Sequence, residues 1–366
     1  MIPWFGSLQS GKPAVLENLP AGEHHRQGLQ GFGLAGILLV SSKPTIDCGE
    51  NFRASARSLA MQSIQSVVIY GAGALGAFYA SKFLDAGEFA VSVAASGERG
   101  RLLEQQGLTV NGRHFPVAVI DPYQQPEPAD LLLVALKHHQ LAAALPELCR
   151  LTGRKTLVLS VMNGLDSEEM IQAACGTRPL LYCIAVGIDG VRQAGEVVVA
   201  NAGRLIFGTA LNDPPGPAVR RLQSALDRAG LAWETPTDML RMLWWKFMVN
   251  VGINQASAVL GAPYGTFQQS ADACRVANDL MREVIALAGP AGINLGEDDL
   301  AAWSQVLNRL APAGKTSMLQ DIEAGRQTEV AIFGGKVVEL GERYGVATPG
   351  NRMMLHLIRV LEKTAN

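Results

Sequence analysis

Residues 71–76 combine residue types that could bind a phosphate group. Their sequence is Gly71-Ala72-Gly73-Ala74-Leu75-Gly76. An apolar run at residues 67–70 precedes this loop, and a helical pattern at residues 74–86 follows it. Between a strand and a helix, the first glycine of Gly-x-Gly-x-x-Gly permits a tight turn, the second lets the backbone approach a pyrophosphate, and the third allows close packing. An ordinary glycine turn is the alternative, but the flanking elements favour a dinucleotide cofactor at this loop.

The end of the next predicted strand, at residues 90–94, bears on which dinucleotide binds. In NAD enzymes an acidic residue at this point usually binds the ribose hydroxyls. This chain has no acid there; Ser96 could donate to a phosphate, and Arg99 or Arg101 could pair with one. The pattern favours NADP and leaves NAD open, because both arginines could equally be solvated charges.

A third group of polar residues lies in the apolar stretch 243–254. Lys246, Asn250 and Asn254 recur there at every fourth position, which on a helix places them along one stripe. Their neighbours are apolar, so the helix is expected to be buried, and buried polar groups need partners. A bound ligand would provide such partners. A structural amide network, with Lys246 reaching out to water, is the alternative.

Polar residues also follow two of the predicted strands. Lys137 follows the apolar run 131–135, and Asn163 follows the run 156–160. In open α/β sheets the carboxyl ends of the strands border the ligand site. We therefore expect both side chains near the nicotinamide half of the cofactor or the substrate, although Asn-Gly at 163–164 is also a common turn sequence.

Ser317 and Glu329 stand where two further helices are expected to begin. Ser317 precedes the sequence Met-Leu-Gln-Asp at 318–321 and is predicted to be its N-cap. Glu329 would begin the next helix, where the helix dipole favours a carboxylate. Capping alone accounts for both residues.

These residues need a scaffold, and strands alternate with helices up to about residue 208. The expected strands are 67–70, 90–94, 131–135, 156–160 and 180–186, and the expected helices are 74–86, 98–106, 139–150 and 166–175. This alternation predicts an α/β Rossmann-type domain, with a parallel sheet and helices on both faces. The following pattern is helical, at 238–260, 270–289, 298–310, 328–345 and 350–363. We expect a dinucleotide-binding domain at 61–235 and an all-α substrate and catalytic domain at 236–366.

Residues 1–60 differ from the rest of the chain. They are rich in Gly, Ser and Pro and show no sustained periodicity. We predict a disordered extension outside the fold, or a natural start at Met61; a small subdomain is the alternative. Mass spectrometry of the native protein tests the start at Met61, which a native N-terminus at Met1 would exclude.

The composition limits the classes of protein to which the chain can belong. Its 366 residues are 48% hydrophobic and 17% charged, as in globular proteins with a sizeable core. The net charge of −2, without a basic stripe, argues against nucleic acid as a partner. No apolar run is long enough to span a bilayer. We expect a cytoplasmic protein that binds neither nucleic acid nor membranes.

The cysteines and histidines indicate neither disulfides nor a metal site. The five cysteines are scattered, odd in number and without Cys-x-x-Cys spacing, which predicts reduced thiols. The adjacent histidines at 24–25 and 138–139 would not face the same way on a helix, so we expect no metal.

Taken together, these residues resemble the ketopantoate reductase (2-dehydropantoate 2-reductase) family over about residues 66–363. The resemblance rests on motifs in the family's order and spacing, across both predicted domains. They are the glycine loop, Leu133-Val134-Ala135-Leu136-Lys137, Asn163-Gly164-Leu165, Trp245-Lys246 with Asn250 and Asn254, Ser317-Met318-Leu319-Gln320-Asp321, and Thr328-Glu329.

The resemblance implies roles for these residues. Lys246 would be the general acid that protonates the carbonyl oxygen as hydride reaches the keto carbon, and Glu329 would bind a substrate hydroxyl. A cationic proton donor suits this reaction, because alkoxide charge develops on the oxygen. The substrate's hydroxyl and carboxylate would be oriented by Asn250, Asn254 and Ser317, with Lys137 and Asn163 lining the site on the cofactor side.

Two positions depart from the family pattern. Ser96 stands where the family usually has an arginine that binds the 2′-phosphate of NADPH. Loss of that arginine removes the basis for a preference for NADPH, unless Arg99 or Arg101 substitutes for it. Gly314 stands where the family often has an asparagine near the substrate. These departures leave open whether NADPH and ketopantoate are the true reactants.

Three functions follow from these patterns. The first is NADPH-dependent reduction of ketopantoate to pantoate in pantothenate and coenzyme A synthesis. The second is reduction of another 2-keto acid by a paralogue, and the third is a non-catalytic NAD(P) sensor. Lys246 and Glu329 argue against the sensor, since binding alone needs neither.

The apolar helices of the second predicted domain could form a homodimer interface or internal core, so the oligomeric state stays open.

Overall fold

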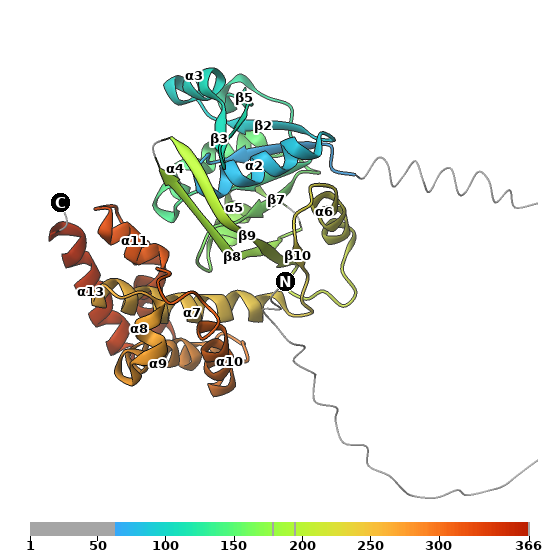
Figure 1. The fold of residues 1–366 in the computed structure, drawn as a ribbon. Coiled ribbons are helices and arrows are strands. Elements are labelled where there is room, and N and C mark those ends of the chain that lie inside the picture. Colours follow the sequence, from blue (N-terminus) through green and yellow to red (C-terminus); the bar gives the residue numbers. More distant parts are fainter. Residues whose placement is uncertain (1–62, 178, 194, 365–366) are drawn as a thin grey trace, which may run out of the picture. The chain divides into compact units, whose positions relative to one another are not determined.

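The computed structural model describes residues 63–177, 179–193 and 195–364. The predicted extension at 1–60 and the start at Met61 lie outside these residues. The described residues form one compact unit, which begins with an α/β part and continues into a helical part (Figure 1).

A five-stranded parallel sheet forms the centre of the α/β part. From edge to edge its strands are β5 (Ala118–Ile120), β2 (Ala90–Ala94), β1 (Ser66–Tyr70), β6 (Leu131–Val134) and β7 (Leu157–Ser160). From β1 the chain moves to one side through β2 and β5, and then returns to the other side through β6 and β7. The order of the strands therefore reverses between β1 and β6, and ligands of open α/β sheets bind at such a point. The carboxyl ends of these two strands lead into the glycine loop and into Lys137.

Helices cover both faces of this sheet. They are α2 (Ala74–Ala86), α3 (Gly97–Gln106), α4 (His138–Leu151) and α5 (Ser167–Cys175). In β6, Leu131 and Leu133 pack into one hydrophobic cluster and Leu132 and Val134 into another, and all four are fully buried. A strand buried on both faces requires an unbroken apolar run, as β6 has. The predicted Rossmann-type fold is confirmed.

The strand predicted at residues 180–186 does not join the parallel sheet. It is the beginning of β8 (Tyr182–Gln193), which pairs antiparallel with β9 (Glu196–Gly208). The other strands of this second sheet are β10 (Trp233–Glu234), β3 (Leu108–Val110) and β4 (Arg113–Phe115). A short apolar run shows that a strand is buried and does not show which sheet it joins, so the prediction was wrong on this point. Helix α6 (Pro217–Arg228) connects β9 to β10.

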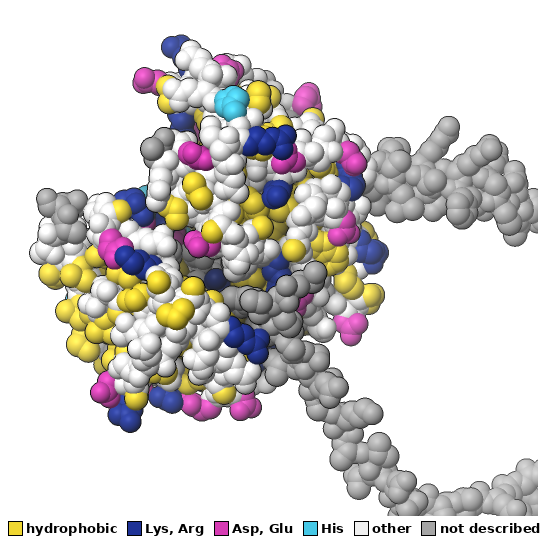
Figure 2. Space-filling model, in the orientation of Figure 1, with side chains coloured by type: hydrophobic (Ala, Val, Ile, Leu, Met, Phe, Trp, Pro, Cys, Tyr) yellow, Lys and Arg dark blue, Asp and Glu magenta, His cyan; other side chains and the backbone are white. Residues whose placement is uncertain are grey.

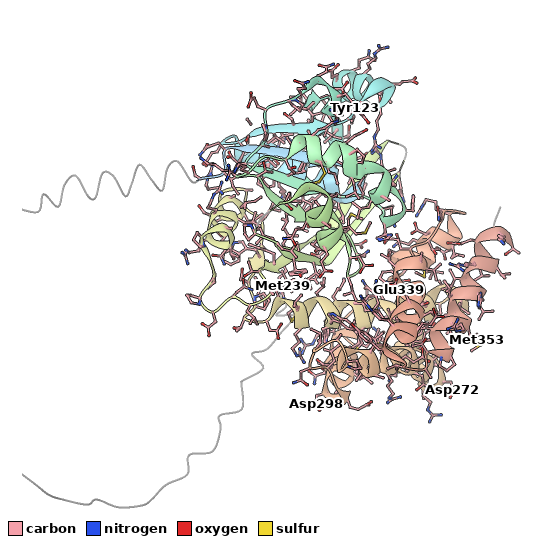
Figure 3. The ribbon with its side chains drawn as sticks, turned by 180° about the vertical axis from the view of Figure 1, so that it is seen from behind. Tyr123, Met239, Asp272, Asp298, Glu339 and Met353 are labelled. Atoms are coloured by element: carbon pink, nitrogen blue, oxygen red, sulfur yellow. A yellow bond between two sulfur atoms is a disulfide. The ribbon has the colours of Figure 1, made fainter. Side chains whose placement is uncertain are left out.

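Helix α7 (Met239–Leu260) is the central element of the helical part, where it packs against four others. The other elements are α8 (Tyr264–Gln269), α9 (Ala271–Ala288), α10 (Glu297–Leu307), α11 (Ser317–Glu323), η2 (Ala331–Gly335), α12 (Lys336–Tyr344) and α13 (Pro349–Thr364). Figure 3 shows these helices from behind, with Glu339 of α12 and Met353 of α13 labelled. Within the described ranges, no helix has both the length and the apolar character needed to cross a membrane.

The helix predicted at residues 328–345 begins later and includes a π-helical turn, η2. Gly334 in this turn lies against α7, because a Cβ there would meet the side-chain oxygen of Gln255, which would have to move. π-helical turns are frequent at functional sites. Glu329 lies just ahead of η2 instead of inside a regular helix.

The prediction that the cysteines are reduced is wrong for Cys149 and Cys175, which form a disulfide. Cys149 lies in α4 and Cys175 in α5, and the two helices pack side by side, which brings the Cα atoms to 4.8 Å. The two residues are separated by 26 positions, so their spacing in the sequence gave no indication of this proximity. Cys183 and Cys274 are free thiols.

Candidate active site

The glycine loop joins β1 to α2 with the geometry that a phosphate-binding turn requires. Gly71 has a φ of +102°, and a Cβ there would lie 2.5 Å from the carbonyl oxygen of Ala135. A Cβ at Gly76 would collide with the Gly71 carbonyl, so the third glycine lets α2 approach the strand. A Cβ at Gly73 would meet no atom within 4 Å, so the space before the first turn of α2 is open. The loop and the free N–H groups of α2 therefore fit a dinucleotide pyrophosphate.

Ser96 and Arg99 lie beyond the carboxyl end of β2, beside the strand that leads into the glycine loop. Ser96 occupies the N-cap position of α3 without forming a side-chain cap, and Arg99 is an exposed residue in the first turn. Arg101 is also exposed. All three side chains are therefore accessible to a ligand at this end of the sheet.

The buried carboxylate of Glu329 contacts two other residues predicted for the site, Asn163 and Lys137. The Asn163 amide donates a hydrogen bond to Glu329 Oε2 over 3.1 Å, and the Lys137 ammonium lies 3.7 Å from the same oxygen. The backbone N–H of His138, at the start of α4, donates to Oε1 over 3.5 Å. Residues from the ends of β6 and β7 thus converge on an acid that precedes η2.

Asp321 is a member of this cluster to which the sequence analysis, although it named the motif at 317–321, gave no role. Lys137 Nζ donates to its Oδ2 over 3.1 Å, and Arg326 Nε donates to its Oδ1 over 2.9 Å. Asp321 is only 5% exposed, and it follows the buried residues Met318 and Leu319 on α11. An acid on the apolar side of a short helix was the available signal, because a buried carboxylate requires a charged or hydrogen-bonding partner.

A buried network of hydrogen bonds joins the residues on either side of the loop that carries Asn163. Ser160 and Ser167 share a hydrogen bond of 2.8 Å between their hydroxyls, and Ser167 donates to Glu168 over 2.7 Å. The backbone N–H of Cys183 in β8 donates to the other oxygen of Glu168 over 3.1 Å. Burial raises the pKa of Glu168 to about 7. Gly164, in the same loop, has a φ of +105°, which favours glycine at that position.

A second ion pair connects this loop to the helical part. Lys336 Nζ, at the start of α12, lies 3.2 Å from Asp166 and 2.8 Å from Glu339, which Figure 3 labels. Lys336 is largely buried, and Asp166 is the residue before α5. Asn163, at the start of the loop, is thus bound to Glu329, and Asp166, at its end, is bound to Lys336. Both partners follow α11 in the chain.

Lys246, Asn250 and Asn254 occupy α7 as predicted. Asn250 and Asn254 are 8% and 6% exposed, and burial lowers the pKa of Lys246 to about 8. Within residues 63–177, 179–193 and 195–364, we find no hydrogen bond or ion pair to any of these three side chains. Helix α7 packs against α11 and η2, the elements beside Asp321 and Glu329. Polar side chains that make no hydrogen bond to the protein, on an otherwise apolar helix, suit a binding site for a polar ligand.

Ser317 is not the N-cap of its helix. Thr316 is the N-cap, and its hydroxyl accepts a hydrogen bond of 3.2 Å from the Leu319 N–H. Thr316 is buried, whereas Ser317 is exposed in the first turn of α11. The prediction was displaced by one residue because threonine and serine cap helices in the same way.

Tyr264 lies against Gly314, where the family often has an asparagine. A Cβ at Gly314 would lie 3.0 Å from the ring atom Cδ2, and the Tyr264 N–H donates to the Gly314 carbonyl over 2.9 Å. Burial, with a smaller contribution from the charge of Asp189, raises the pKa of the Tyr264 phenol to about 12. A longer side chain at Gly314 would require this ring to move.

Both the α/β part and the helical part of the chain match known proteins. The sequence model described as ketopantoate reductase PanE/ApbA matches residues 67–212, and the model for its C-terminal part matches residues 238–362. The 2-dehydropantoate 2-reductase of Archaeoglobus fulgidus is 29% identical over 304 residues, which are 82% of this chain and 98% of the relative.

Solved structures share the fold. The 2-dehydropantoate 2-reductase from Methylococcus capsulatus has a TM-score of 0.71 at 26% identity, covering 82% of this chain and 98% of that chain. The ternary structure of D-mandelate dehydrogenase with NADH and anilino(oxo)acetate has a TM-score of 0.73 at 22% identity, covering 82% and 100% of the two chains. With both sequence models matched in order, the chain belongs to the ketopantoate reductase family of NAD(P)-dependent 2-keto acid reductases.

Proposed function

We propose that this protein reduces 2-dehydropantoate (ketopantoate) to pantoate with NADPH, a step of pantothenate and coenzyme A synthesis. The observation that carries the proposal is the contact of Glu329 with Asn163 and Lys137. It joins the strand ends that border a cofactor in this fold to an acid suited to binding a substrate hydroxyl. The names of the relatives support the same reaction.

Lys246 is the general acid in this proposal. The bound nicotinamide supplies the hydride that adds to the keto carbon. As negative charge develops on the carbonyl oxygen, the Lys246 ammonium donates a proton to it, and the product is the alcohol. The neutral amine then takes a proton from water. Burial lowers the Lys246 pKa to about 8, so the ammonium predominates at neutral pH but releases its proton more readily than an exposed lysine does.

The remaining site residues hold the substrate. Glu329 accepts a hydrogen bond from a substrate hydroxyl, and the buried amides of Asn250 and Asn254 orient the hydroxyl and carboxylate. Lys137 and Asn163 contact the substrate and the nicotinamide side of the cofactor, while they position Glu329. The exposed hydroxyl of Ser317 is the last of the proposed substrate contacts.

The cofactor is held by the glycine loop, residues 71–76, and by groups beyond β2. Ser96 and Arg99 bind the 2′-phosphate of NADPH in place of the family's usual arginine, and their accessibility supports this role. NADH is the alternative cofactor. The ratio of kcat/KM for NADPH to that for NADH decides between them.

A reductase of another 2-keto acid is the second candidate function, and the contact of Tyr264 with Gly314 favours it. One assay separates the candidates: oxidation of NADPH and of NADH is followed with ketopantoate and with a panel of 2-keto acids. Fastest turnover with ketopantoate supports the proposal, and faster turnover with another acid supports the second candidate. Cofactor binding without turnover of any acid would leave a non-catalytic sensor.

We propose that the two domains span residues 61–235 and 236–366.

We also propose a homodimer formed through α13. Three exposed apolar side chains, those of Met353, Leu357 and Val360, recur along that helix at intervals of four and three residues. Light scattering should give twice the chain mass, and Leu357→Glu should give the chain mass. In Figure 2, basic and acidic side chains are interspersed over the face shown, and we propose no nucleic-acid partner.

A further inference from the structure

Arg192 of β8 reaches the glycine loop of the cofactor site. Its guanidinium donates a hydrogen bond from Nη1 to the carbonyl oxygen of Ala72, which lies between the first two glycines of the motif. The two residues are 120 positions apart in the chain. The hairpin of β8 and β9 brings them together, since both strands pack against α2.

The backbone around Arg192 lies close to the first turn of α2. A Cβ placed on Gly190, two residues earlier in β8, would lie 3.8 Å from the Cβ of Ala74, the first residue of α2. The space beside Gly73 is open, because a Cβ there would meet nothing within 4 Å. The guanidinium therefore stands beside the open space at the N-terminus of α2, where dinucleotide pyrophosphates bind.

The charge of Arg192 is available for a ligand. Over the described ranges, no carboxylate forms an ion pair with it, and the side chain is exposed. A guanidinium carries five N–H donors, and the bond to Ala72 occupies one, so the others can bind phosphate oxygens.

We propose that Arg192 is a cofactor-binding residue that pairs with the pyrophosphate of the dinucleotide. The assignment to the pyrophosphate follows from Ala72, because the glycine loop binds that group, whereas Ser96 and Arg99 lie at the end of β2, where the adenosine ribose binds. Arg192 therefore contributes equally to the binding of NADPH and of NADH. This inference rests on the proposed cofactor site and is independent of the identity of the keto acid.

The test measures dissociation constants by calorimetry, without keto acid, for Arg192→Gln, Arg192→Lys and the unaltered protein. The ligands are NADPH, NADH, ADP-ribose, which contains the pyrophosphate, and 2′-AMP, which lacks it. We expect Arg192→Gln to weaken the first three by the same factor, about 10- to 100-fold, and to leave 2′-AMP unchanged. Arg192→Lys should restore part of the loss, since it keeps the charge but not the planar fork.

Two controls make the result specific. Arg275→Gln removes an arginine that is 76% exposed on α9 and should change no dissociation constant, whereas Arg99→Gln should weaken NADPH and 2′-AMP alone. Unchanged binding of all ligands by Arg192→Gln, or a loss confined to NADPH and 2′-AMP, would overturn the assignment. If the unaltered protein bound neither NADPH nor NADH, the proposed function itself would fail, whatever the variants did.

Discussion

The side-chain amide of Asn163 donates a hydrogen bond of 3.1 Å to the carboxylate of Glu329, 166 residues later in the chain. Asn163 follows β7 of the cofactor-type sheet, and Glu329 precedes η2 of the helical part. The glutamate is only 8% exposed, so its carboxylate is largely shielded from water. The Asn163 amide and the nearby Lys137 ammonium provide the polar partners that a buried carboxylate needs. A substrate hydroxyl bound to Glu329 would consequently be held close to residues from the carboxyl ends of β6 and β7.

Glu329→Gln should lower kcat/KM for the keto acid by roughly 10- to 100-fold, because the neutral amide accepts a weaker hydrogen bond from the substrate and from Asn163. The dissociation constant for NADPH should change little. Steady-state kinetics and calorimetry measure the two effects. Glu323→Gln, which alters an exposed acid on α11, is the matched control and should keep the unaltered kinetics. Equal kcat/KM in both variants would exclude Glu329 from the substrate site.

The two glycines at 71 and 73 should respond differently to substitution by alanine. Gly71→Ala should lower the melting temperature, since φ is +102° there and the new Cβ would lie 2.5 Å from the Ala135 carbonyl oxygen. Gly73→Ala should leave the melting temperature nearly unchanged, because its Cβ meets no atom within 4 Å, yet it should weaken NADPH binding. Calorimetric unfolding and NADPH titration separate these effects. Unweakened NADPH binding by Gly73→Ala would contradict a pyrophosphate beside that residue.

The pH dependence of kcat should report the Lys246 ammonium. Burial lowers the pKa of Lys246 from 10.5 to about 8, so the proton-donating form predominates below pH 8 and is lost above it. Because only the ammonium can donate the proton, kcat for reduction should be level below about pH 8 and fall about tenfold per pH unit above it. A kcat that stayed level to pH 10 would show that this ammonium does not supply the proton.

Glu168 should make the stability of the fold depend on pH. Burial raises its pKa from 4.5 to about 7, so between these values the folded protein holds a proton that the unfolded chain releases. The free energy of unfolding should therefore fall as the pH rises from about 4.5 to about 7, by about 3 kcal/mol from this group alone. Glu168→Gln, which does not titrate, should remove that slope in denaturant titrations. The same slope in both proteins would argue against a protonated Glu168.

The sequence allowed prediction of features that depend on local spacing. The glycine loop between β1 and α2, and the stripe of Lys246, Asn250 and Asn254 on α7, follow from periods that a strand and a helix impose. The hydrogen bond between Asn163 and Glu329 could not be predicted from local spacing, because no local rule relates residues so far apart. The family resemblance placed both residues at the substrate site without indicating this bond.

Contacts made by tertiary packing were not predictable in this way. Arg192 reaches Ala72 only because the chain after α5 forms a long hairpin, whereas the apolar run at 180–186 indicated one more strand of the parallel sheet. The disulfide of Cys149 and Cys175 likewise depends on the packing of α4 against α5.

The most direct test of the proposed function is the turnover of ketopantoate by Lys246→Ala with saturating NADPH. If Lys246 is the general acid, kcat should fall by roughly 10²- to 10⁴-fold while the NADPH dissociation constant stays within about twofold. Lys315→Ala, which removes a half-exposed lysine paired with Glu323, should keep the kcat of the unaltered protein. A near-normal kcat for Lys246→Ala would contradict the central claim that this lysine protonates the substrate.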